Sequence, residues 1–168
     1  MSPPSASAFD NLPVAEVLRR FSGGPQTGIF TDGSAQPNPG PGGWGMVHVV
    51  DGKIIAEAHG KAPHTTNNRM ELSGLIAALK SLPVDAKIEV FTDSELCVNT
   101  VTKWAASWER NGWRRKSGAI ANLELVQELY ALARARPGVQ LKWIKAHNGW
   151  LWNEYADALS TAWAREIV

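Results

Sequence analysis

The spacing of apolar and polar residues predicts five short strands and four main helices. Short apolar or alternating runs bounded by turn residues predict strands, over residues 26–31, 43–50, 53–60, 87–92 and 139–145. Asp51-Gly52 lies between the second and third runs and is a strong two-residue hairpin signal. Apolar residues at helical spacing predict helices over residues 68–82, 94–104 (extending to 108), 122–136 and 151–167. The order β-β-β-α-β-α-α-β-α indicates an α/β fold, a mixed five-stranded sheet flanked by helices.

The first 25 residues form an N-terminal extension to a domain of residues 26–168 in this interpretation. Residues 1 to about 10 are rich in Ser, Pro and Ala, which is typical of disorder. Asn11 could cap a short helix that starts at Pro13, with an apolar stripe of Val14, Val17, Leu18 and Phe21. We expect this helix to dock on the domain; a weak binding element is the alternative.

Composition limits the classes of protein that this chain can be. Its 168 residues, 44% hydrophobic and 20% charged, suit one soluble globular domain. The net charge of +1 does not by itself indicate a polyanionic partner, so any electropositive surface must be local. A single cysteine, Cys97, excludes a disulfide or a cysteine-based zinc site within the chain. The apolar runs are too short to span a bilayer and the N-terminus does not resemble a secretory signal, so we expect a cytoplasmic protein.

Two aspartates occupy equivalent positions in the pattern. Asp32 and Asp93 each end an expected strand, follow a threonine and precede a small residue. If the two strands are parallel neighbours, the carboxylates lie side by side at one sheet edge, where open α/β sheets bind ligands. The alternatives are local: Asp32-Gly33 is ordinary turn chemistry, and Asp93 could cap the following helix.

Two further acids lie beside the apolar stripes of helices. Glu71 is in the first turn of its helix and points toward the sheet, although Asn68 and Glu71 also resemble a capping box. Asp157 follows Asn153 by one turn on the last helix, where a solvated face is the alternative. Carboxylates held together raise one another's pKa unless a cation neutralises them. An oxygen-only ligand set favours a hard cation, with Mg²⁺ the natural candidate.

His147 lies in the loop between the fifth strand and the last helix, close to Gly149. A lone loop histidine is commonly only solvent-exposed. Here the loop precedes the helix that carries Asp157, so an imidazole on a mobile segment would lie near the acids. This position suits a proton carrier better than a metal ligand.

Together, four motifs in register resemble the type 1 ribonuclease H family (bacterial-type ribonuclease HI) over about residues 26–164. They are Thr31-Asp32-Gly33-Ser34 with Asn38 to Gly45, Thr65 to Leu72, Thr92-Asp93-Ser94, and Lys145 to Gly149 with Asn153, Ala156 and Asp157. The resemblance implies the ribonuclease H-like fold and hydrolysis of the RNA strand of an RNA–DNA hybrid, leaving 5′-phosphate and 3′-hydroxyl ends.

The resemblance also assigns catalytic roles to residues. The metal-binding carboxylates fall on Asp32, Glu71, Asp93 and Asp157, and the mobile catalytic histidine on His147. Two Mg²⁺ ions roughly 4 Å apart would activate a water and stabilise the leaving oxygen, with Mn²⁺ as the alternative ion.

Substrate contacts are implied in the same way. Asn38, Asn67 and Asn68 match residues that reach the hybrid's minor groove, where the 2′-hydroxyl distinguishes RNA. Thr66 matches part of a DNA-strand phosphate pocket, and Asn153 joins the expected substrate-binding set. Five basic residues against Glu109 give a local net charge of +4 among three tryptophans: Lys103, Arg110, Arg114, Arg115 and Lys116, with Trp104, Trp108 and Trp113. This stretch resembles a substrate-binding protrusion that grips the DNA strand, in which Trp104, Arg114, Arg115 and Lys116 are expected contacts; a solvated loop over buried tryptophans is the alternative.

Some positions depart from the family pattern. Glu95 stands where Gln is common and adds an acid near the site, and Ala146 stands where Gly is usual before the histidine. None of the four acids is missing. Two other functions stay open on sequence alone: a non-catalytic hybrid-binding module and a related metal-dependent DNA nuclease. Because one domain supplies every motif, we expect a monomer.

Overall fold

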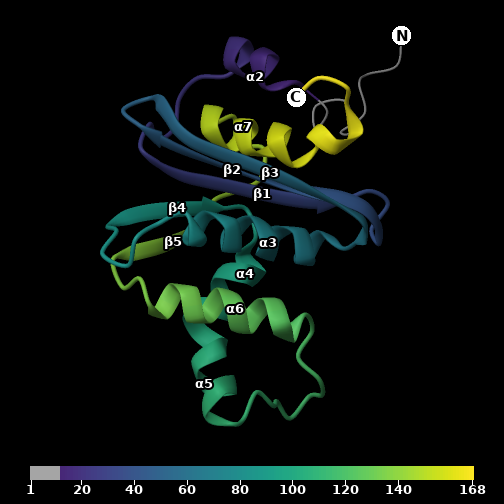
Figure 1. The fold of residues 1–168 in the computed structure, drawn as a ribbon, viewed down its shortest axis with the longest axis vertical. Helices are drawn as coiled ribbons and strands as arrows, with labels where there is room; N and C mark the ends of the chain where they lie inside the picture. Colours follow the sequence, from purple (N-terminus) through teal and green to yellow (C-terminus); the bar gives the residue numbers. More distant parts are fainter. Residues whose placement is uncertain (1–11) are drawn as a thin grey trace.

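The computed structural model describes residues 12–168 as one mixed sheet with helices on both faces (Figure 1). The strands lie in the order β3-β2-β1-β4-β5. Their bounds are β1 Gly28–Ala35, β2 Gly40–Val50, β3 Lys53–Thr65, β4 Ile88–Thr92 and β5 Val139–Trp143. β1, β2 and β3 pair antiparallel, whereas β4 pairs parallel with β1 and with β5. The predicted fold class and strand order along the chain are confirmed.

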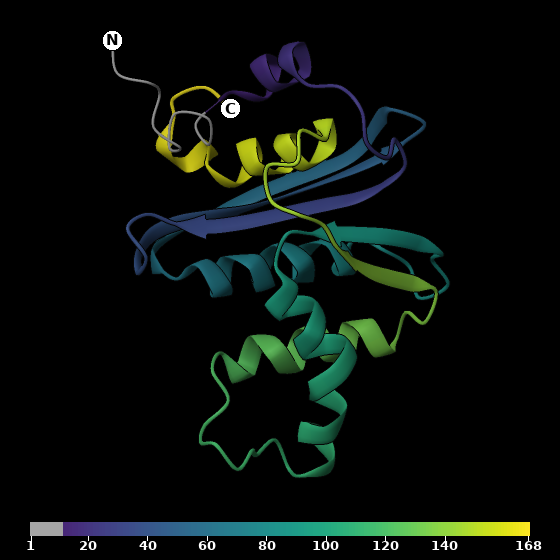
Figure 2. The same ribbon diagram turned by 180° about the vertical axis from the view of Figure 1, so that it is seen from behind.

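Helices cover the two faces of the sheet unequally. On one side lie α3 (Asn67–Lys80), α4 (Glu95–Asn99) and α6 (Leu123–Arg134), and on the other α7 (Leu151–Ser160) with α2 (Val14–Arg20) outside it (Figures 1 and 2). A π-helical turn, η1 (Thr100–Trp104), joins α4 to α5 (Ala105–Arg110). α5 and the loop after it extend away from the sheet. A 3₁₀ turn, η2 (Ala162–Ala164), follows α7.

Each face of the sheet has its own apolar core. Leu72, Leu75 and Leu79 of α3 pack with Leu129 of α6 on one face and are almost fully buried. Phe30, Val47 and Leu159 are buried on the other face, under α7. The apolar stripes expected for α3 and α7 therefore face the sheet, and that of α6 packs on α3. Burial of these side chains stabilises the layers by roughly 1.5–3 kcal/mol each.

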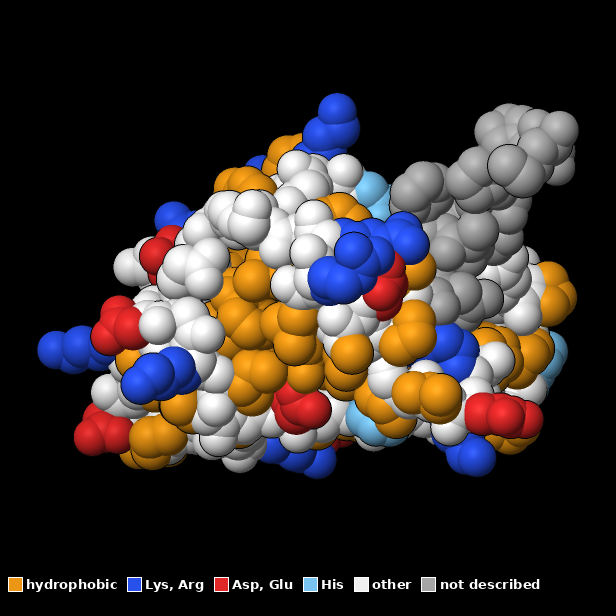
Figure 3. All heavy atoms as spheres, turned by 90° about the horizontal axis from the view of Figure 1, so that it is seen from above, with side chains coloured by type: hydrophobic (Ala, Val, Ile, Leu, Met, Phe, Trp, Pro, Cys, Tyr) orange, Lys and Arg blue, Asp and Glu red, His pale blue; other side chains and the backbone are white. Residues whose placement is uncertain are grey.

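The α2 side of the molecule has an apolar area at its centre with charged side chains at its margins (Figure 3). Leu12, Val14, Phe21, Trp150 and Leu151 are partly buried against the core on this side. Trp150 meets Phe91 edge to face with 6.3 Å between ring centroids, and Trp152 Nε1 donates to Gln26 Oε1 at 3.1 Å. Trp152 thus belongs to the core on this side, and Trp150 and Leu151 pack against it.

Several element ends differ from the sequence prediction. β3 continues to Thr65 rather than 60, and β2 begins at Gly40, because the two strands pair from Val50–Lys53 to Gly40–Thr65. Pairing along this long ribbon orders residues that read as loop by composition. The last helix ends at Ser160 and gives way to η2, so the expected helix to 167 is too long.

The N-terminal helix docks as expected. Val17 is 2% exposed, and Val14 N donates to Val168 O at 2.8 Å, which ties α2 to the end of the chain. Pro13 is the N-cap rather than the first helical residue, and Leu18 is 47% exposed rather than part of a buried stripe. The expectations for residues 1–10 and for Asn11 lie outside the described residues. Within residues 12–168, no helix is both long enough and apolar enough to cross a membrane.

Candidate active site

The register of β1 and β4 places Asp32 and Asp93 together. The parallel pairing of these strands runs from Ile29–Val90 to Thr31–Thr92, so Asp32 and Asp93 are the next residue along each chain, Asp93 just after the end of β4. The prediction that the strands are parallel neighbours is confirmed. Asp32 is not the last residue of β1, however, because β1 continues to Ala35 through its antiparallel pairing with β2.

Two glycines allow the helices that carry the other acids to approach the sheet. A Cβ on Gly33 would lie 2.2 Å from the carbonyl carbon of Met70, so the first turn of α3 rests directly on β1. A Cβ on Gly45 would lie 2.8 Å from Ala156 O, so α7 rests on β2 in the same way. Because side chains at these positions would separate the layers, the glycines bring Glu71 and Asp157 to Asp32.

Hydroxyl side chains, rather than the acids, cap the adjacent helices. Thr66 Oγ1 accepts from Arg69 N at 3.2 Å at the start of α3, so the alternative of a capping box formed by Asn68 and Glu71 is wrong. Ser94 Oγ accepts from Cys97 N at 3.2 Å and caps α4. The cap interpretation of Asp93 is therefore also wrong, and its carboxylate is not used to start the helix.

The four predicted acids line one concavity of about 220 Å³, here called the acid pocket. Its other walls are Gly33, Ser34, Gln36, Asn67, His147 and Thr161. Carboxylate oxygens of Asp32, Glu71 and Asp93 lie within 4.8 Å of one another. Asp32 is only 6% exposed, and Glu71 Oε2 is buried without a hydrogen-bond partner among the described residues.

The negative charges of the buried carboxylates in the acid pocket repel one another. Burial, then the charges of Asp93, Glu71 and Asp157, raise the pKa of Asp32 well above its ordinary value. Burial and the charge of Asp93 likewise raise the pKa of Glu71. Carboxylates are kept this close in proteins where a cation or a proton neutralises them. The oxygen-only donor set and the unpartnered Glu71 oxygen fit a hard divalent cation.

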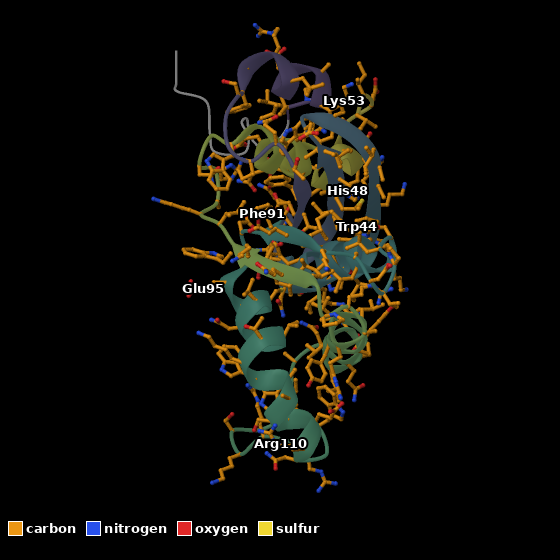
Figure 4. The ribbon with its side chains drawn as sticks, turned by 90° about the vertical axis from the view of Figure 1, so that its left-hand side faces the viewer. Trp44, His48, Lys53, Phe91, Glu95 and Arg110 are labelled. Atoms are coloured by element: carbon orange, nitrogen blue, oxygen red, sulfur yellow. The ribbon has the colours of Figure 1, made fainter. Side chains whose placement is uncertain are left out.

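Glu95 does not join these acids. It is exposed, begins α4, and lies at the side of the molecule near the end of the sheet (Figure 4). It is not among the residues that line the acid pocket. Its side chain therefore extends toward solvent rather than into the pocket.

His147 lies at the rim of the acid pocket above a buried acid that sequence reasoning missed. Its Nδ1 is 3.6 Å from Glu154 Oε2, and the Glu154 side chain is 7% exposed. Ligand atoms of His147, Glu154 and Asp157 also lie within 4.8 Å of one another. The spacing in the sequence could have identified Glu154. It precedes Asp157 by three residues on α7, and residues three apart are neighbours on the surface of a helix.

The loop that carries His147 is shaped by its own amides. Asn148 Oδ1 accepts from Trp150 N at 3.0 Å and from Asn153 Nδ2 at 3.5 Å. His147 has φ 50°, a backbone conformation that is uncommon for residues other than glycine. Asn153, expected to bind substrate, is 4% exposed, so its amide supports the loop rather than facing solvent.

Of the three asparagines expected to contact a minor groove, Asn67 lines the acid pocket, whereas Asn38 and Asn68 do not. Asn67 Oδ1 accepts from Ala35 N at 2.8 Å, and Asn67 N donates to Asn38 Oδ1 at 3.1 Å. This pair joins the end of β1 to the start of α3. Asn68 is on the opposite side of the helix start and lines a separate groove of about 330 Å³ with Leu96, Trp104, Trp108 and Arg115.

The basic arm, residues 103–118, borders this groove. Arg114, Arg115 and Lys116 are exposed, and Arg110 lies at the far end of α5 (Figure 4). Trp104 is 39% exposed and lies with its ring centroid 6.1 Å from that of Trp108. Trp108 and Trp113 are half-buried, and Trp113 packs edge to face on Tyr130. The arm thus combines an apolar base with exposed cations.

Comparisons with known proteins all identify ribonucleases H as similar to this chain. The family model for RNase H matches residues 25–165. A Ribonuclease H of Methylorubrum extorquens is 43% identical over 143 residues, covering 85% of this chain and 62% of that protein. A Ribonuclease H of Hahella chejuensis is 40% identical over 141 residues, covering 83% of this chain and 94% of that protein.

Among solved structures, LC11-RNase H1 in complex with RNA/DNA hybrid superposes with a TM-score of 0.61 at 30% identity. That match covers 79% of this chain and 92% of the other. The matched region contains all four acids, His147 and the basic arm. The chain belongs to the ribonuclease H family, whose members are metal-dependent nucleases.

Proposed function

We propose that this protein is an endoribonuclease that hydrolyses the RNA strand of RNA–DNA hybrids and leaves 5′-phosphate and 3′-hydroxyl ends. The observation that carries the proposal is the convergence of Asp32, Glu71, Asp93 and Asp157 in one acid pocket at the edge of the sheet. A related solved structure holds an RNA/DNA hybrid, which supports the substrate class.

Asp32, Glu71, Asp93 and Asp157 would hold Mg²⁺, with two ions present during catalysis and Mn²⁺ as a substitute. Ions bound there supply Lewis-acid stabilisation to the attacking and departing oxygens of an in-line displacement. The acids themselves fix the ligand positions, since two come from adjacent strands and two from helices packed directly on the sheet.

His147 would move protons at the rim of the acid pocket. Its imidazole is half exposed, with 51% of the side chain accessible, so it can exchange protons with solvent as well as with the reacting phosphate. Glu154, buried beneath Nδ1, would orient the ring.

Two surfaces would bind the two strands of the hybrid. Asn38, Asn67 and Asn68 would read the minor groove, where the 2′-hydroxyl marks the RNA strand. Thr66 would contact a DNA-strand phosphate, and Trp104, Arg114, Arg115 and Lys116 would hold the DNA strand along the groove beside the basic arm. Asn153 would act indirectly, by supporting the His147 loop.

Cleavage of an end-labelled hybrid with Mg²⁺ tests the proposal. We expect wild-type protein to cut only the RNA strand, Asp93→Asn to bind the hybrid without cutting it, and Asp85→Asn, at an exposed acid outside the pocket, to cut normally. Wild-type protein that binds the hybrid and leaves it intact would indicate a binding module instead. Equal cleavage of an all-DNA duplex would indicate a DNA nuclease.

We also propose that the protein is a cytoplasmic monomer and that residues 1–25 are an extension to the catalytic domain. The family match starts at residue 25, and the described residues of one chain supply the whole acid pocket, which supports both assignments. Sedimentation at micromolar concentration tests the monomer, because a second copy would double the mass.

A further inference from the structure

Five residues beyond the end of α7 lies an arginine that the sequence motifs did not single out. Arg165 is half-buried beyond η2 and turns back onto the helix that carries Asp157. Its Nη2 donates to Ala158 O at 2.6 Å, and its Nη1 donates to Thr161 Oγ1 at 2.8 Å. A single guanidinium thus contacts both the residue after Asp157 and a residue one turn further along.

Thr161 connects this arginine to the acid pocket. Thr161 is one of the residues that line the pocket, together with the four acids. Its backbone N and its Oγ1 each lie 3.2 Å from Asp157 O and can donate to it. Thr161 Oγ1 therefore links the backbone carbonyl of Asp157 to the guanidinium of Arg165.

The segment that contains Arg165 is fixed at its other end. Arg165 Nε donates to Ile167 O at 3.2 Å, and Val168 O accepts from Val14 N at 2.8 Å. Since α2 packs against α7 through Val17, the chain after α7 runs between two anchored points. The guanidinium is consequently held against the helix end rather than free to sample solvent.

The electrostatic interaction between Arg165 and Asp157 also links this arginine to the acid pocket. Burial lowers the pKa of Arg165, and the carboxylate of Asp157 opposes that lowering, so the two opposite charges attract each other. A cation there reduces the repulsion among the clustered carboxylates, and it also repels a divalent ion on the pocket side.

We propose that Arg165 is a positioning residue of the active site, which fixes Asp157 through Thr161 and the last turn of α7 and offsets part of the negative charge of the acid pocket. The inference rests on the proposed function for its catalytic consequence. Its consequence for cation binding can be measured on the protein alone, without substrate.

The chain offers a matched control. Arg136 is also half-buried and also caps a helix end, with Nη1 donating to Leu132 O at 3.1 Å and Nε to Leu82 O at 3.0 Å. It follows α6, on the opposite side of the sheet from α7. Arg136→Gln therefore loses the same kind of helix cap without touching the acid pocket.

Three variants separate charge from geometry: Arg165→Gln, Arg165→Lys and Arg136→Gln. For Arg165→Gln we expect kcat on the hybrid to fall about three- to tenfold with KM unchanged, less than the 10²-fold loss that a displacement of about 1 Å can cause. Calorimetry without substrate should show Mg²⁺ binding about two- to fivefold tighter, because a nearby positive charge is gone.

Arg165→Lys should keep wild-type Mg²⁺ affinity, since the charge stays, but retain only part of kcat, since an ammonium cannot reproduce the forked pair of bonds. Arg136→Gln should lower the melting temperature and leave kcat and Mg²⁺ affinity unchanged. If Arg165→Gln matches Arg136→Gln in both quantities, Arg165 is only a helix cap and the proposal is overturned. A wild-type protein that cleaves no hybrid would refute the proposed function instead, while the Mg²⁺ comparison still decides the role of Arg165.

Discussion

The acid pocket and the basic arm are opposite in charge and opposite in construction. The acids are largely withdrawn from solvent, and they are carried by two adjacent strands and by two helices that rest on glycines of the sheet. The cations of the arm are exposed and lie on a short helix and a loop that leave the sheet. Burial gives the pocket strong, short-range interactions, whereas exposure leaves the arm with weak interactions that depend on salt.

The difference in burial suits the acid pocket and the basic arm to different functions. Close and desolvated carboxylates destabilise the metal-free fold and bind a divalent cation strongly, which suits the chemical step. Exposed cations cost little stability and attract phosphates from a distance without fixing their position, which suits substrate capture. Changes in the pocket should therefore affect kcat and stability, and changes in the arm should affect KM and salt dependence.

The largest effect is expected for Asp32→Asn, which removes a carboxylate that interacts with the other three acids of the pocket. Turnover on the hybrid should fall roughly 10³-fold or more, because metal-assisted displacement needs every ligand in place. Binding of the hybrid, followed by fluorescence anisotropy, should persist. A variant with near-normal turnover would show that the pocket is not the catalytic centre.

His147→Ala should be the next largest. Loss of a positioned proton carrier should lower kcat by about 10²-fold, at the low end for general acid–base groups, and leave hybrid affinity near normal. Single-turnover and steady-state rates measured side by side would locate the loss. A large loss of affinity would instead make His147 a substrate ligand.

A triple variant of the basic arm should bind the hybrid more weakly, because it loses three phosphate contacts; it carries Arg114→Ala, Arg115→Ala and Lys116→Ala. We expect KM to rise roughly tenfold at moderate salt, with kcat little changed. The slope of log affinity against log salt concentration should fall by up to about three. Arg19→Ala with Arg20→Ala, on α2, removes exposed charges elsewhere and should change neither quantity. An unchanged salt slope in the arm variant would refute the grip assigned to this region.

The smallest effect concerns stability and pH. The ordinary pKa values of Asp32 and Glu71 are 3.8 and 4.5, and both are raised in the folded protein. The unfolded chain therefore loses these protons first as pH rises, so metal-free stability should fall as pH increases above about 4. Melting temperatures with chelator should be higher at pH 5 than at pH 8, and Mg²⁺ should remove most of the difference.

Asp32→Asn tests the origin of that pH dependence. The variant should be more stable than wild type without metal at pH 8, on the order of 1 kcal/mol or 2–4 °C in melting temperature. Asp85→Asn, at an exposed acid, serves as the matched control. An equal pH slope in Asp32→Asn and wild type would mean that other groups cause it.

The sheet and the four acids could be predicted because their signals are local and repeated. Asp32 and Asp93 share the same short context at the ends of apolar runs, and a parallel sheet places equivalent positions side by side. Leu75 and Leu79 show the helical period that buries α3. Periodic apolar positions of this kind predict the structure well because they all lie on the buried face of a helix or strand.

The remaining features depend on contacts that are distant in sequence. Residues 61–65 extend β3 only because β2 lies beside them, and Thr66 rather than Asn68 caps α3 because of where that strand ends. Glu154 acquires a role only when the loop places His147 above it. Arg165 reaches Ala158 O and Thr161 by turning back along α7, which no periodicity reveals.

The π-helical turn Thr100–Trp104 determines where the basic arm points. Such a turn closes its hydrogen bonds one residue later than an α-helix does, so it acts as a one-residue insertion in the helix that starts at Glu95. Deleting one residue here would rotate α5 and the loop after it by about 100° around the helix axis and shift them back along that axis by about 1.5 Å. Related chains that differ by one residue in this turn would present their tryptophans and cations to a different side, so the length of this turn could tune which nucleic-acid geometry fits between arm and pocket.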